Sequence, residues 1–295
     1  MHLFNLEFLL CPYNLNMNPV VKKFAVIGHP IEHSLSPHIH KLFAKQSQIE
    51  LYYGRVDVER EAMLTQLDHF KGEGFLGLNV TLPLKHDAYL LCQELSDKAR
   101  LSESVNTISI KNQQLFGDTT DGVGLIRDLA NKGIYLEGKR CLLMGAGGAA
   151  NAVMADLISS QPTALYLTNR TIEKSMLMES HWNDYAKKNS VALKVADLNA
   201  ENLSHYDVII NATSAGLTSE LSPLPRGIIN SNTICYDMLY GRETPFIRQA
   251  LEANAEVFDG IGMLIEQAAE SFRIWHEVKP DTSEVLNELR ALKLI

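Results

Sequence analysis

The sequence is poor in cysteine and has no long hydrophobic run. Four cysteines occur among 295 residues, and no two of them form a Cys-x-x-Cys pair, which excludes a disulfide-based scaffold and the common cysteine-rich zinc modules. This cysteine usage is typical of a reducing compartment, so we expect a cytoplasmic protein. No apolar segment reaches the roughly 20 residues that a membrane-spanning helix needs, so we expect no membrane partner.

Positive charge is also scarce. The chain has 27 Lys and Arg against 35 Asp and Glu, which gives a formal net charge of −8. This balance argues against a nucleic-acid partner, because proteins that bind nucleic acid present a basic surface to the phosphates. A small anionic substrate would have to be captured by local hydrogen-bond donors.

Histidines cluster in the N-terminal third of the chain. The cluster consists of His29, His33, His38 and His40, with His69 further along the chain. No cysteine or acidic cluster accompanies them to complete the three or four ligands that a metal ion needs. We therefore expect no metal site.

The chain shows a regular alternation of strand-like and helix-like segments. Strands are predicted at residues 23–28, 51–58, 74–82, 140–144, 164–170, 207–213 and 233–240. Helices are predicted at residues 36–47, 60–70, 83–95, 121–133, 263–278 and 283–294. Residues 105–118 are expected to form a hairpin that turns near Asn112. Alternation of this kind predicts an α/β protein with mainly parallel sheets and helices on their faces.

A glycine-rich loop follows the strand predicted at residues 140–144. The stretch "GAGGAA", residues 145–150, fits the pattern G-x-G-x-x-[GA] and opens a helix, as in dinucleotide-binding units. Gly145 permits the tight turn, Gly147 lets the backbone approach a pyrophosphate, and Ala150 allows close packing of helix on strand. The phosphates would sit on free N–H groups at the helix N-terminus. A tight strand-to-helix turn without a ligand is the alternative.

The end of the next strand indicates which dinucleotide binds. A site for NAD should carry an acidic residue there, to bind the ribose 2′-hydroxyl. This chain has Asn169, Arg170 and Thr171 instead, with Lys174 one turn further on. Arg170 can pair with a 2′-phosphate through its planar fork of donors. We therefore predict NADP(H) as the cofactor; an arginine that merely ends the strand is the alternative.

The alternation predicts two domains and a short leader. Residues 20–120 together with 260–295 are expected to form one discontinuous α/β domain, because the last two helices have no following strand and should fold back on it. Residues 121–259 are expected to form a Rossmann-type NADP-binding domain. Residues 1–19 are expected to be an N-terminal extension.

Several polar residues of the first domain have two possible interpretations. Ser34 and Ser36 could bind a carboxylate, or Ser36 could cap the following helix, with Pro37 at its first position. Asp121 could likewise be a helix cap, and Asn106 could serve a turn. Each residue taken alone leaves the choice open.

Together the motifs resemble the shikimate dehydrogenase family. The stretches that carry the resemblance are "GHPIEHSLSP", "NVTLPLK", "VNT", "GDTTDGVG", "GAGGAA", "NRT", "INATSAG", "YDMLY" and "DGIGMLIEQAA", in that order. The likeness runs from about Phe24 to the C-terminus. It implies reversible, NADPH-dependent reduction of 3-dehydroshikimate to shikimate, in aromatic amino-acid biosynthesis, by a monomer or homodimer.

The resemblance also implies roles for individual residues. The catalytic residues would be Lys85 and Asp121. The substrate-binding residues would be Ser34, Ser36, Asn79, Thr81, Asn106, Tyr240 and Gln267. The cofactor-binding residues would be Gly145, Ala146, Gly147, Gly148, Ala149, Asn169, Arg170, Thr171, Lys174, Thr213, Met238 and Gly260.

The chain departs from the family pattern at two positions. It has His29 where many members have Asn in a Gly-Asn-Pro stretch, and Thr119 where many have Asn before Thr-Asp-Gly. Three alternatives stay open: a quinate/shikimate dehydrogenase that also uses NAD, a methylene-tetrahydrofolate dehydrogenase, and an NADPH-binding sensor without activity. The second should not need a paired-serine carboxylate site.

Lys85 is the expected proton donor and would act as a coupled pair with Asp121; an ordinary solvated helix lysine is the alternative. Ketone reduction needs a hydride donor and a proton donor at the oxygen, and the protein supplies the latter. A lysine can serve when its proton affinity is tuned toward the working pH. Lys85 should lie in the first helical turn after Pro83, where the helix dipole disfavours a second positive charge, whereas Asp121 nearby would favour it.

Overall fold

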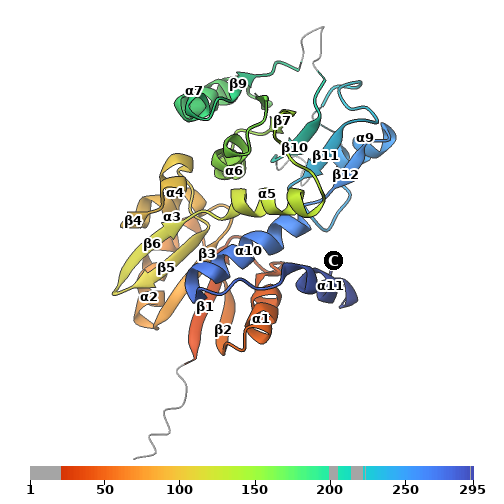
Figure 1. Cartoon of the computed structure of the whole chain (residues 1–295). Helices are drawn as coiled ribbons and strands as arrows, with labels where there is room; N and C mark the ends of the chain where they lie inside the picture. Colours follow the sequence, from red (N-terminus) through yellow and green to blue (C-terminus); the bar gives the residue numbers. More distant parts are fainter. Residues whose placement is uncertain (1–20, 199–204, 214–221, 223, 293) are drawn as a thin grey trace, which may run out of the picture.

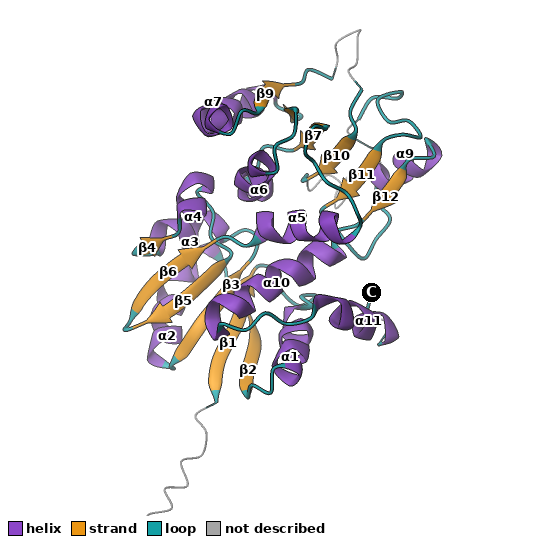
Figure 2. Cartoon of the chain, viewed as in Figure 1, coloured by secondary structure: helices purple, strands orange, loops and turns teal. Residues whose placement is uncertain are grey.

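The computed structural model describes residues 21–198, 205–213, 222, 224–292 and 294–295. Within them the chain forms two six-stranded sheets, one above the other in Figure 1, and Figure 2 shows the helices that surround them. The two-unit α/β architecture that the alternation predicts is confirmed. The N-terminal extension expected at residues 1–19 lies outside the described residues.

The first sheet is mixed. Its strands are β1 (Lys22–Gly28), β2 (Leu51–Asp57), β3 (Phe75–Val80), β4 (Glu94–Leu95), β5 (Thr107–Lys111) and β6 (Gln114–Asp118), in the spatial order β2-β1-β3-β5-β6-β4. Strands β1, β2 and β3 are parallel, whereas β5 is antiparallel to both β3 and β6. The predicted hairpin is confirmed, and its turn uses left-handed backbone at Asn112 (φ 49°) and Gln113 (φ 65°).

The second sheet is wholly parallel, as a Rossmann-type unit requires. Its strands are β7 (Arg140–Met144), β8 (Ala164–Thr168), β9 (Ala192–Val195), β10 (Val208–Asn211), β11 (Ile234–Asp237) and β12 (Glu256–Phe258), in the order β12-β11-β10-β7-β8-β9. Strands β7 and β10 are buried on both faces, which explains their continuous apolar sequences.

The helices cover both faces of each sheet. They are η1 (Arg60–Ala62), α1 (Ser36–Gln46), α2 (Met63–Gly72), α3 (Lys85–Leu91), α4 (Asp97–Ser102), α5 (Asp121–Asn131), α6 (Gly148–Ser159), α7 (Ile172–Lys188), α9 (Pro245–Glu252), α10 (Ile261–His276) and α11 (Thr282–Ala291). Helices α2, α3 and α4 share a core with one face of the first sheet. The tail helices α10 and α11 pack with α1 on its other face. In Figure 1, α5 and α10 run between the two sheets.

The prediction of one helix over residues 83–95 is wrong in its second half. Helix α3 ends at Leu91, and the chain then forms β4 beside β6. The side chain of Gln93 accepts a hydrogen bond from the Leu115 N–H (2.8 Å), and its own backbone N–H donates to the Leu115 carbonyl (3.1 Å). Ser96 then starts α4, because its Oγ accepts from the Ala99 N–H (3.2 Å). These tertiary bonds outweigh the local helical pattern.

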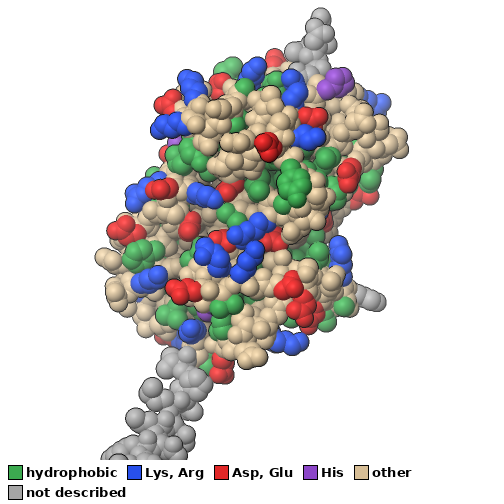
Figure 3. Space-filling model, in the orientation of Figure 1, with side chains coloured by type: hydrophobic (Ala, Val, Ile, Leu, Met, Phe, Trp, Pro, Cys, Tyr) green, Lys and Arg blue, Asp and Glu red, His purple; other side chains and the backbone are tan. Residues whose placement is uncertain are grey.

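The surface that Figure 3 shows carries both signs of charge. Lys and Arg side chains are interspersed with Asp and Glu over both units on this face. Among the helices of the described residues, none combines the length and apolarity of a bilayer span.

The layer between α1 and the first sheet contains a buried histidine. The His40 side chain is fully buried, and its ring stacks on that of Tyr53 with centroids 4.1 Å apart and planes at 10°. Burial lowers the pKa of His40 to about 3, so the ring is neutral near neutral pH. In the unfolded chain the same ring has its ordinary pKa of 6.5.

This burial predicts a loss of stability in mild acid. Below pH 6.5 the unfolded state binds a proton at His40 that the folded state does not, so stability falls as pH falls toward 3. From His40 alone, the free energy of unfolding should be about 2 kcal/mol lower at pH 5 than at pH 7. Urea unfolding of wild type and His40→Phe at both pH values measures this, and the substitution should reduce the difference. The same change at exposed His69 is the control; an equal reduction there would contradict the assignment.

Candidate active site

A cleft of about 730 Å³ lies between the two units, where the carboxyl ends of β1 and β3 face those of β7, β8, β10 and β11. In open α/β sheets this is the edge at which ligands bind. The cleft brings together all the residues predicted to act in catalysis or substrate binding: Lys85, Asp121, Ser34, Ser36, Asn79, Thr81, Asn106, Tyr240 and Gln267. It is also lined by all those predicted to contact the cofactor: Gly145, Ala146, Gly147, Gly148, Ala149, Asn169, Arg170, Thr171, Lys174, Thr213, Met238 and Gly260.

Lys85 and Asp121 form an ion pair in this cleft. Lys85 is the first residue of α3 and Asp121 the first residue of α5, and Lys85 Nζ donates to Asp121 Oδ2 at 2.6 Å. The side chains are 16% and 8% exposed. Lys85 therefore lies in the first helical turn, as predicted, and is not a solvated surface lysine. An ammonium held against a carboxylate in a partly buried cleft can transfer a proton to a bound oxygen.

The helix-cap interpretation of Asp121 is wrong. The N-cap of α5 is Thr120, and its side chain makes no capping bond. The two Asp121 oxygens are instead taken by Lys85 and by Asn106 Nδ2, which donates to Oδ1 at 2.9 Å. Both carboxylate oxygens therefore bond to residues of the cleft and not to the helix end.

The cap interpretation of Ser36 is also wrong. Helix α1 begins at Ser36, and its N-cap is Leu35, which offers no side-chain acceptor. Ser34 has part of the helix-starting role, because its Oγ accepts from the Ser36 N–H at 3.3 Å. Ser36 is 6% exposed, yet it lines the cleft with Ser34. Two hydroxyls beside a helix N-terminus are suitable donors to a carboxylate.

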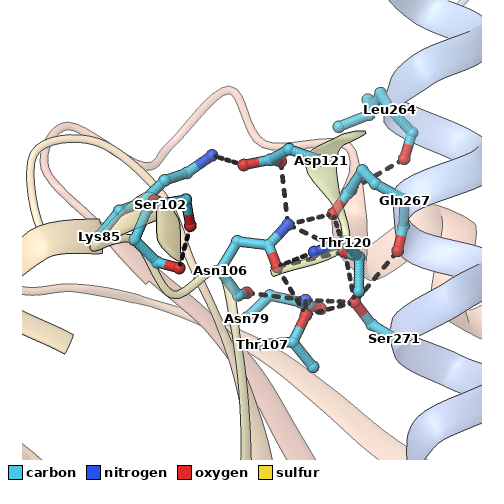
Figure 4. Close-up of polar contacts among 11 residues, drawn as sticks. Asn79, Lys85, Ser102, Asn106, Thr107, Thr120, Asp121, Leu264, Gln267 and Ser271 are labelled. Carbon is cyan, nitrogen blue, oxygen red and sulfur yellow. Dashed lines mark hydrogen bonds and ion pairs between the residues drawn. The ribbon is translucent and has the colours of Figure 1, made fainter. Parts of the chain in front are cut away.

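Three amide side chains line the cleft, and Figure 4 shows their contacts. Asn106 Nδ2 donates to Gln267 Oε1 at 3.2 Å as well as to Asp121, and Gln267 Nε2 donates to the Leu264 carbonyl at 2.8 Å. Asn79 Nδ2 donates to Ser271 Oγ at 2.9 Å. Asn106 is thus part of the site and does not merely serve a turn.

Sequence reasoning missed the hydroxyls behind these amides. They belong to Thr107, Thr120 and Ser271, all of which are buried. Ser271 follows Gln267 by four residues in α10 and therefore lies on the same helix face. That spacing was the available signal, although a small residue inside an amphipathic helix ordinarily indicates packing.

Tyr240 adds a neutral hydroxyl to the lining of the cleft. Its ring packs against the core that α1, α10 and α11 form, and burial raises the pKa of Tyr240. The phenol therefore stays protonated near neutral pH and can donate a hydrogen bond to a ligand oxygen.

The glycine loop has the geometry that a pyrophosphate needs. Gly145 has φ 110°, and a Cβ there would lie 3.1 Å from the Ala212 carbonyl, so this turn favours glycine. A Cβ at Gly147 would meet no atom within 4 Å, which means that the loop is open on the side of the cleft. Helix α6 begins at Gly148, and Ala150 is fully buried against the sheet. These positions fit a dinucleotide with its phosphates at the helix N-terminus.

The ends of β8 and β11 complete the cofactor side. Arg170 and Thr171 are exposed directly after β8, and Asn169 Nδ2 donates to the Thr171 carbonyl at 3.0 Å. This turn offers a guanidinium and no carboxylate to a 2′-phosphate. Beyond β11, a Cβ at Gly260 would approach the Met238 carbonyl to 2.3 Å, so only glycine allows this contact.

Comparisons with known proteins agree with this geometry. Three family models match the chain: the shikimate dehydrogenase substrate binding domain over residues 26–108, shikimate / quinate 5-dehydrogenase over residues 128–219, and the shikimate 5′-dehydrogenase C-terminal domain over residues 260–290. A shikimate dehydrogenase (NADP(+)) from Methylobacillus flagellatus is 45% identical over 91% of this chain and 99% of its own length.

Two solved structures have the same fold. Shikimate 5-dehydrogenase from Thermus thermophilus, in complex with NADP(H) and shikimate, superposes with a TM-score of 0.82 at 30% identity, covering 93% of this chain and all of that one. The Ael1 enzyme from Pseudomonas putida superposes with a TM-score of 0.83 at 36% identity, covering 91% of this chain and 98% of that one.

Proposed function

Because this chain belongs to the shikimate dehydrogenase family, we propose that it catalyses the reversible, NADPH-dependent reduction of 3-dehydroshikimate to shikimate in aromatic amino-acid biosynthesis. One observation carries the proposal. The Lys85–Asp121 ion pair lies in a cleft that has the paired serines and amides on one side and the glycine loop and Arg170 on the other. A small hydroxy acid and a phosphorylated dinucleotide can therefore meet at the lysine.

The cofactor supplies the hydride when it is bound. The glycine loop would hold its pyrophosphate, and Arg170 with Lys174 would hold the 2′-phosphate. Ser34 and Ser36 bind the substrate carboxylate, which leaves the ring hydroxyls to Asn79, Asn106 and Gln267. In this orientation the carbonyl oxygen faces Lys85.

Lys85 then acts as the general acid. Its ammonium donates a proton to the oxygen as negative charge develops there, and in the reverse direction the neutral amine accepts that proton. Asp121 holds Nζ at 2.6 Å and so fixes the direction of the donor. Asn106 holds the other carboxylate oxygen, which prevents Asp121 from rotating away.

The domain organisation is part of the proposal. Residues 20–120 and 260–295 form the substrate domain, and residues 121–259 form the cofactor domain. The core shared by α1, α10 and α11 supports the assignment of the C-terminal residues to the first domain. We place the protein in the cytoplasm as a monomer or homodimer, and the free thiols of Cys92, Cys141 and Cys235 fit a reducing compartment.

Cofactor-dependent oxidation of shikimate, followed by the absorbance of the reduced nicotinamide, tests the function. The proposal predicts turnover with NADP and shikimate. Comparable rates with NAD and quinate would favour the broader quinate/shikimate enzyme. Binding of NADPH without any turnover would identify a sensor and overturn the proposal.

Ser36→Ala tests the carboxylate site. The substitution should weaken shikimate binding by about 1.5–3 kcal/mol, the contribution of a hydrogen bond to a charged group. The melting temperature should change little, because Leu35 and not Ser36 is the cap of α1. Isothermal calorimetry with shikimate and thermal unfolding measure the two effects.

Ser96→Ala is the matched control for this experiment. Ser96 does cap a helix, with its Oγ 3.2 Å from the Ala99 N–H, and it does not line the cleft. It should lower the melting temperature and leave shikimate binding intact. A Ser36→Ala protein that behaves like Ser96→Ala would show that Ser36 has only a structural role.

A further inference from the structure

The buried hydrogen bonds behind the side-chain amides of Asn79 and Asn106 have a defined direction of donation. Thr120 donates its backbone N–H to Asn106 Oδ1 at 2.9 Å. Because a backbone N–H can only donate, the oxygen of the Asn106 amide must lie on this side. Its nitrogen therefore faces Asp121, to which it donates.

The direction extends from Asn106 to Ser271. Thr107 Oγ1 lies 2.9 Å from Asn106 Oδ1, and because that oxygen can only accept, the Thr107 hydroxyl donates its single proton there. In the contact of 2.7 Å between Thr107 Oγ1 and Ser271 Oγ, Ser271 is then the donor, and its one proton is shared with the Gln267 carbonyl, which lies 3.1 Å from the same Oγ. Ser271 is left with its lone pairs as acceptors.

The series of hydrogen bonds continues from Ser271 to Asn79. Asn79 Nδ2 donates to the backbone carbonyl of Asn106 at 3.2 Å, which places the nitrogen on that side, and it also donates to Ser271 Oγ at 2.9 Å. The Asn79 oxygen therefore faces the opposite direction. Tyr53 donates its hydroxyl to that oxygen at 2.7 Å.

Tyr53 is held in place as a donor. Its ring stacks on fully buried His40, and burial raises the pKa of Tyr53 well above its ordinary value, so the phenol keeps its proton. Asn79 is 5% exposed. Without the Tyr53 hydroxyl its side-chain oxygen would lose the donor that lies 2.7 Å away, and a buried acceptor that loses its donor is costly.

We propose that Tyr53, Ser271 and Thr107 are positioning residues, which join Asn79 and Asn106 into one hydrogen-bond chain directed at the Asp121 carboxylate. The order of donation is Tyr53, Asn79, Ser271, Thr107, Asn106 and Asp121. The proposal rests on the proposed function, because the two asparagines are its substrate contacts. The chain fixes which face of each amide meets the substrate, and Lys85 approaches Asp121 from the other end.

Tyr53→Phe and Ser271→Ala test the two links that hold Asn79. Each should raise the KM for shikimate about 3- to 10-fold, as expected for the loss of a neutral buried hydrogen bond. The KM for NADP should stay within about a factor of two. Because both act through one amide, the double variant should raise KM by less than the product of the single effects. A full product, or unchanged KM values with a lowered melting temperature, would overturn the proposal.

Tyr236→Phe is the matched control. Tyr236 is fully buried and, like Tyr53, donates its hydroxyl to a side-chain oxygen, here Asp128 Oδ2 at 2.6 Å, but it does not line the cleft. It should lower the melting temperature without changing the KM for shikimate.

Thr107 lies at the centre of the hydrogen-bond chain. Thr107→Val should raise the KM for shikimate, whereas Thr107→Ser, which keeps the hydroxyl, should restore it. Equal effects of Val and Ser would show that packing, and not the hydroxyl, matters.

A measurement on the ligand-free protein separates this inference from the proposed function. In wild type, the side-chain amide protons of Asn79 should exchange slowly with solvent in NMR spectra, because they are buried and bonded. Tyr53→Phe and Ser271→Ala should accelerate that exchange, whereas Tyr236→Phe should not. Failure of wild type to oxidise shikimate would overturn the proposed function alone. If exchange of the Asn79 amide protons is insensitive to both substitutions, the proposed hydrogen-bond chain is wrong.

Discussion

Lys85→Met should lower the turnover number for shikimate oxidation by about 10²–10⁴-fold, the usual effect of removing a positioned general acid or base. Methionine keeps the length and apolar stem of the side chain and removes only the charge and the proton. The KM for NADP should be nearly unchanged, because Lys85 lies on the substrate side of the cleft. Steady-state kinetics with both substrates varied would measure this.

The structure offers a matched control for Lys85. Lys98 pairs with Asp156 at the same distance of 2.6 Å, also between the two units, but it does not line the cleft. Lys98→Met should leave turnover near the wild-type value. The control separates the loss of an ion pair between the two units from the loss of the proton-transfer group. A Lys85→Met protein that keeps near-normal turnover across the pH range would show that Lys85 is not the proton-transfer residue.

Asp121 has a different role in the same pair. Asp121→Asn preserves the size of the side chain and an oxygen, but it removes the negative charge that holds the ammonium at 2.6 Å. The amide cannot accept from both Lys85 and Asn106 on its two atoms, since one of them is now a donor. Loss of activity in both Lys85→Met and Asp121→Asn, without an additive effect in the double variant, would be typical of residues that act as a unit.

The local features of the site could be predicted from sequence because each depends on neighbouring residues. Pro83 two residues before Lys85 marks the start of a helix, and α3 does begin at Lys85. The glycine spacing at residues 145–150 needs only the turn between β7 and α6. The position of Arg170 just after β8 follows directly from the strand pattern. In these cases the physical cause lies within one turn of the chain.

The rest of the site depends on contacts between distant segments. The Asn106–Gln267 bond joins residues 161 positions apart, and the Asn79–Ser271 bond joins residues 192 positions apart. Ser271 alone looks like a small residue that packs inside α10, and its spacing from Gln267 indicates only a shared helix face, without naming a hydrogen-bond partner. The same limit explains β4, since the strand exists only because β6 lies beside it.

Capping was the main source of wrong alternatives. A serine or aspartate before a helix is a good cap by residue type, and both Ser36 and Asp121 satisfied that rule. In the structure each is the first helical residue, one position too late to cap. Their side chains are free of the helix end and available to the cleft. A single-residue shift of a helix boundary thus changes the functional meaning of a residue.

Arg170→Ala should raise the KM for NADP by about 10²-fold or more and change the KM for NAD little. Two charge-assisted hydrogen bonds from one guanidinium to a phosphate contribute about 3 kcal/mol or more together, and NAD has no phosphate at this position. Arg170→Lys should give an intermediate value, because lysine keeps the charge and loses the planar fork. The ratio of kcat/KM for the two cofactors measures the effect directly.

Arg140 provides the control at the opposite end of the same sheet. Its guanidinium packs over the Tyr166 ring and donates to the His205 carbonyl at 3.1 Å, so Arg140→Ala removes a structural arginine of similar type. It should lower stability and leave the NADP-to-NAD ratio unchanged. An Arg170→Ala protein that loses affinity equally for both cofactors would match this control and would show that Arg170 does not select the 2′-phosphate. In that case selectivity would have to come from Lys174 and the neutral donors Asn169 and Thr171.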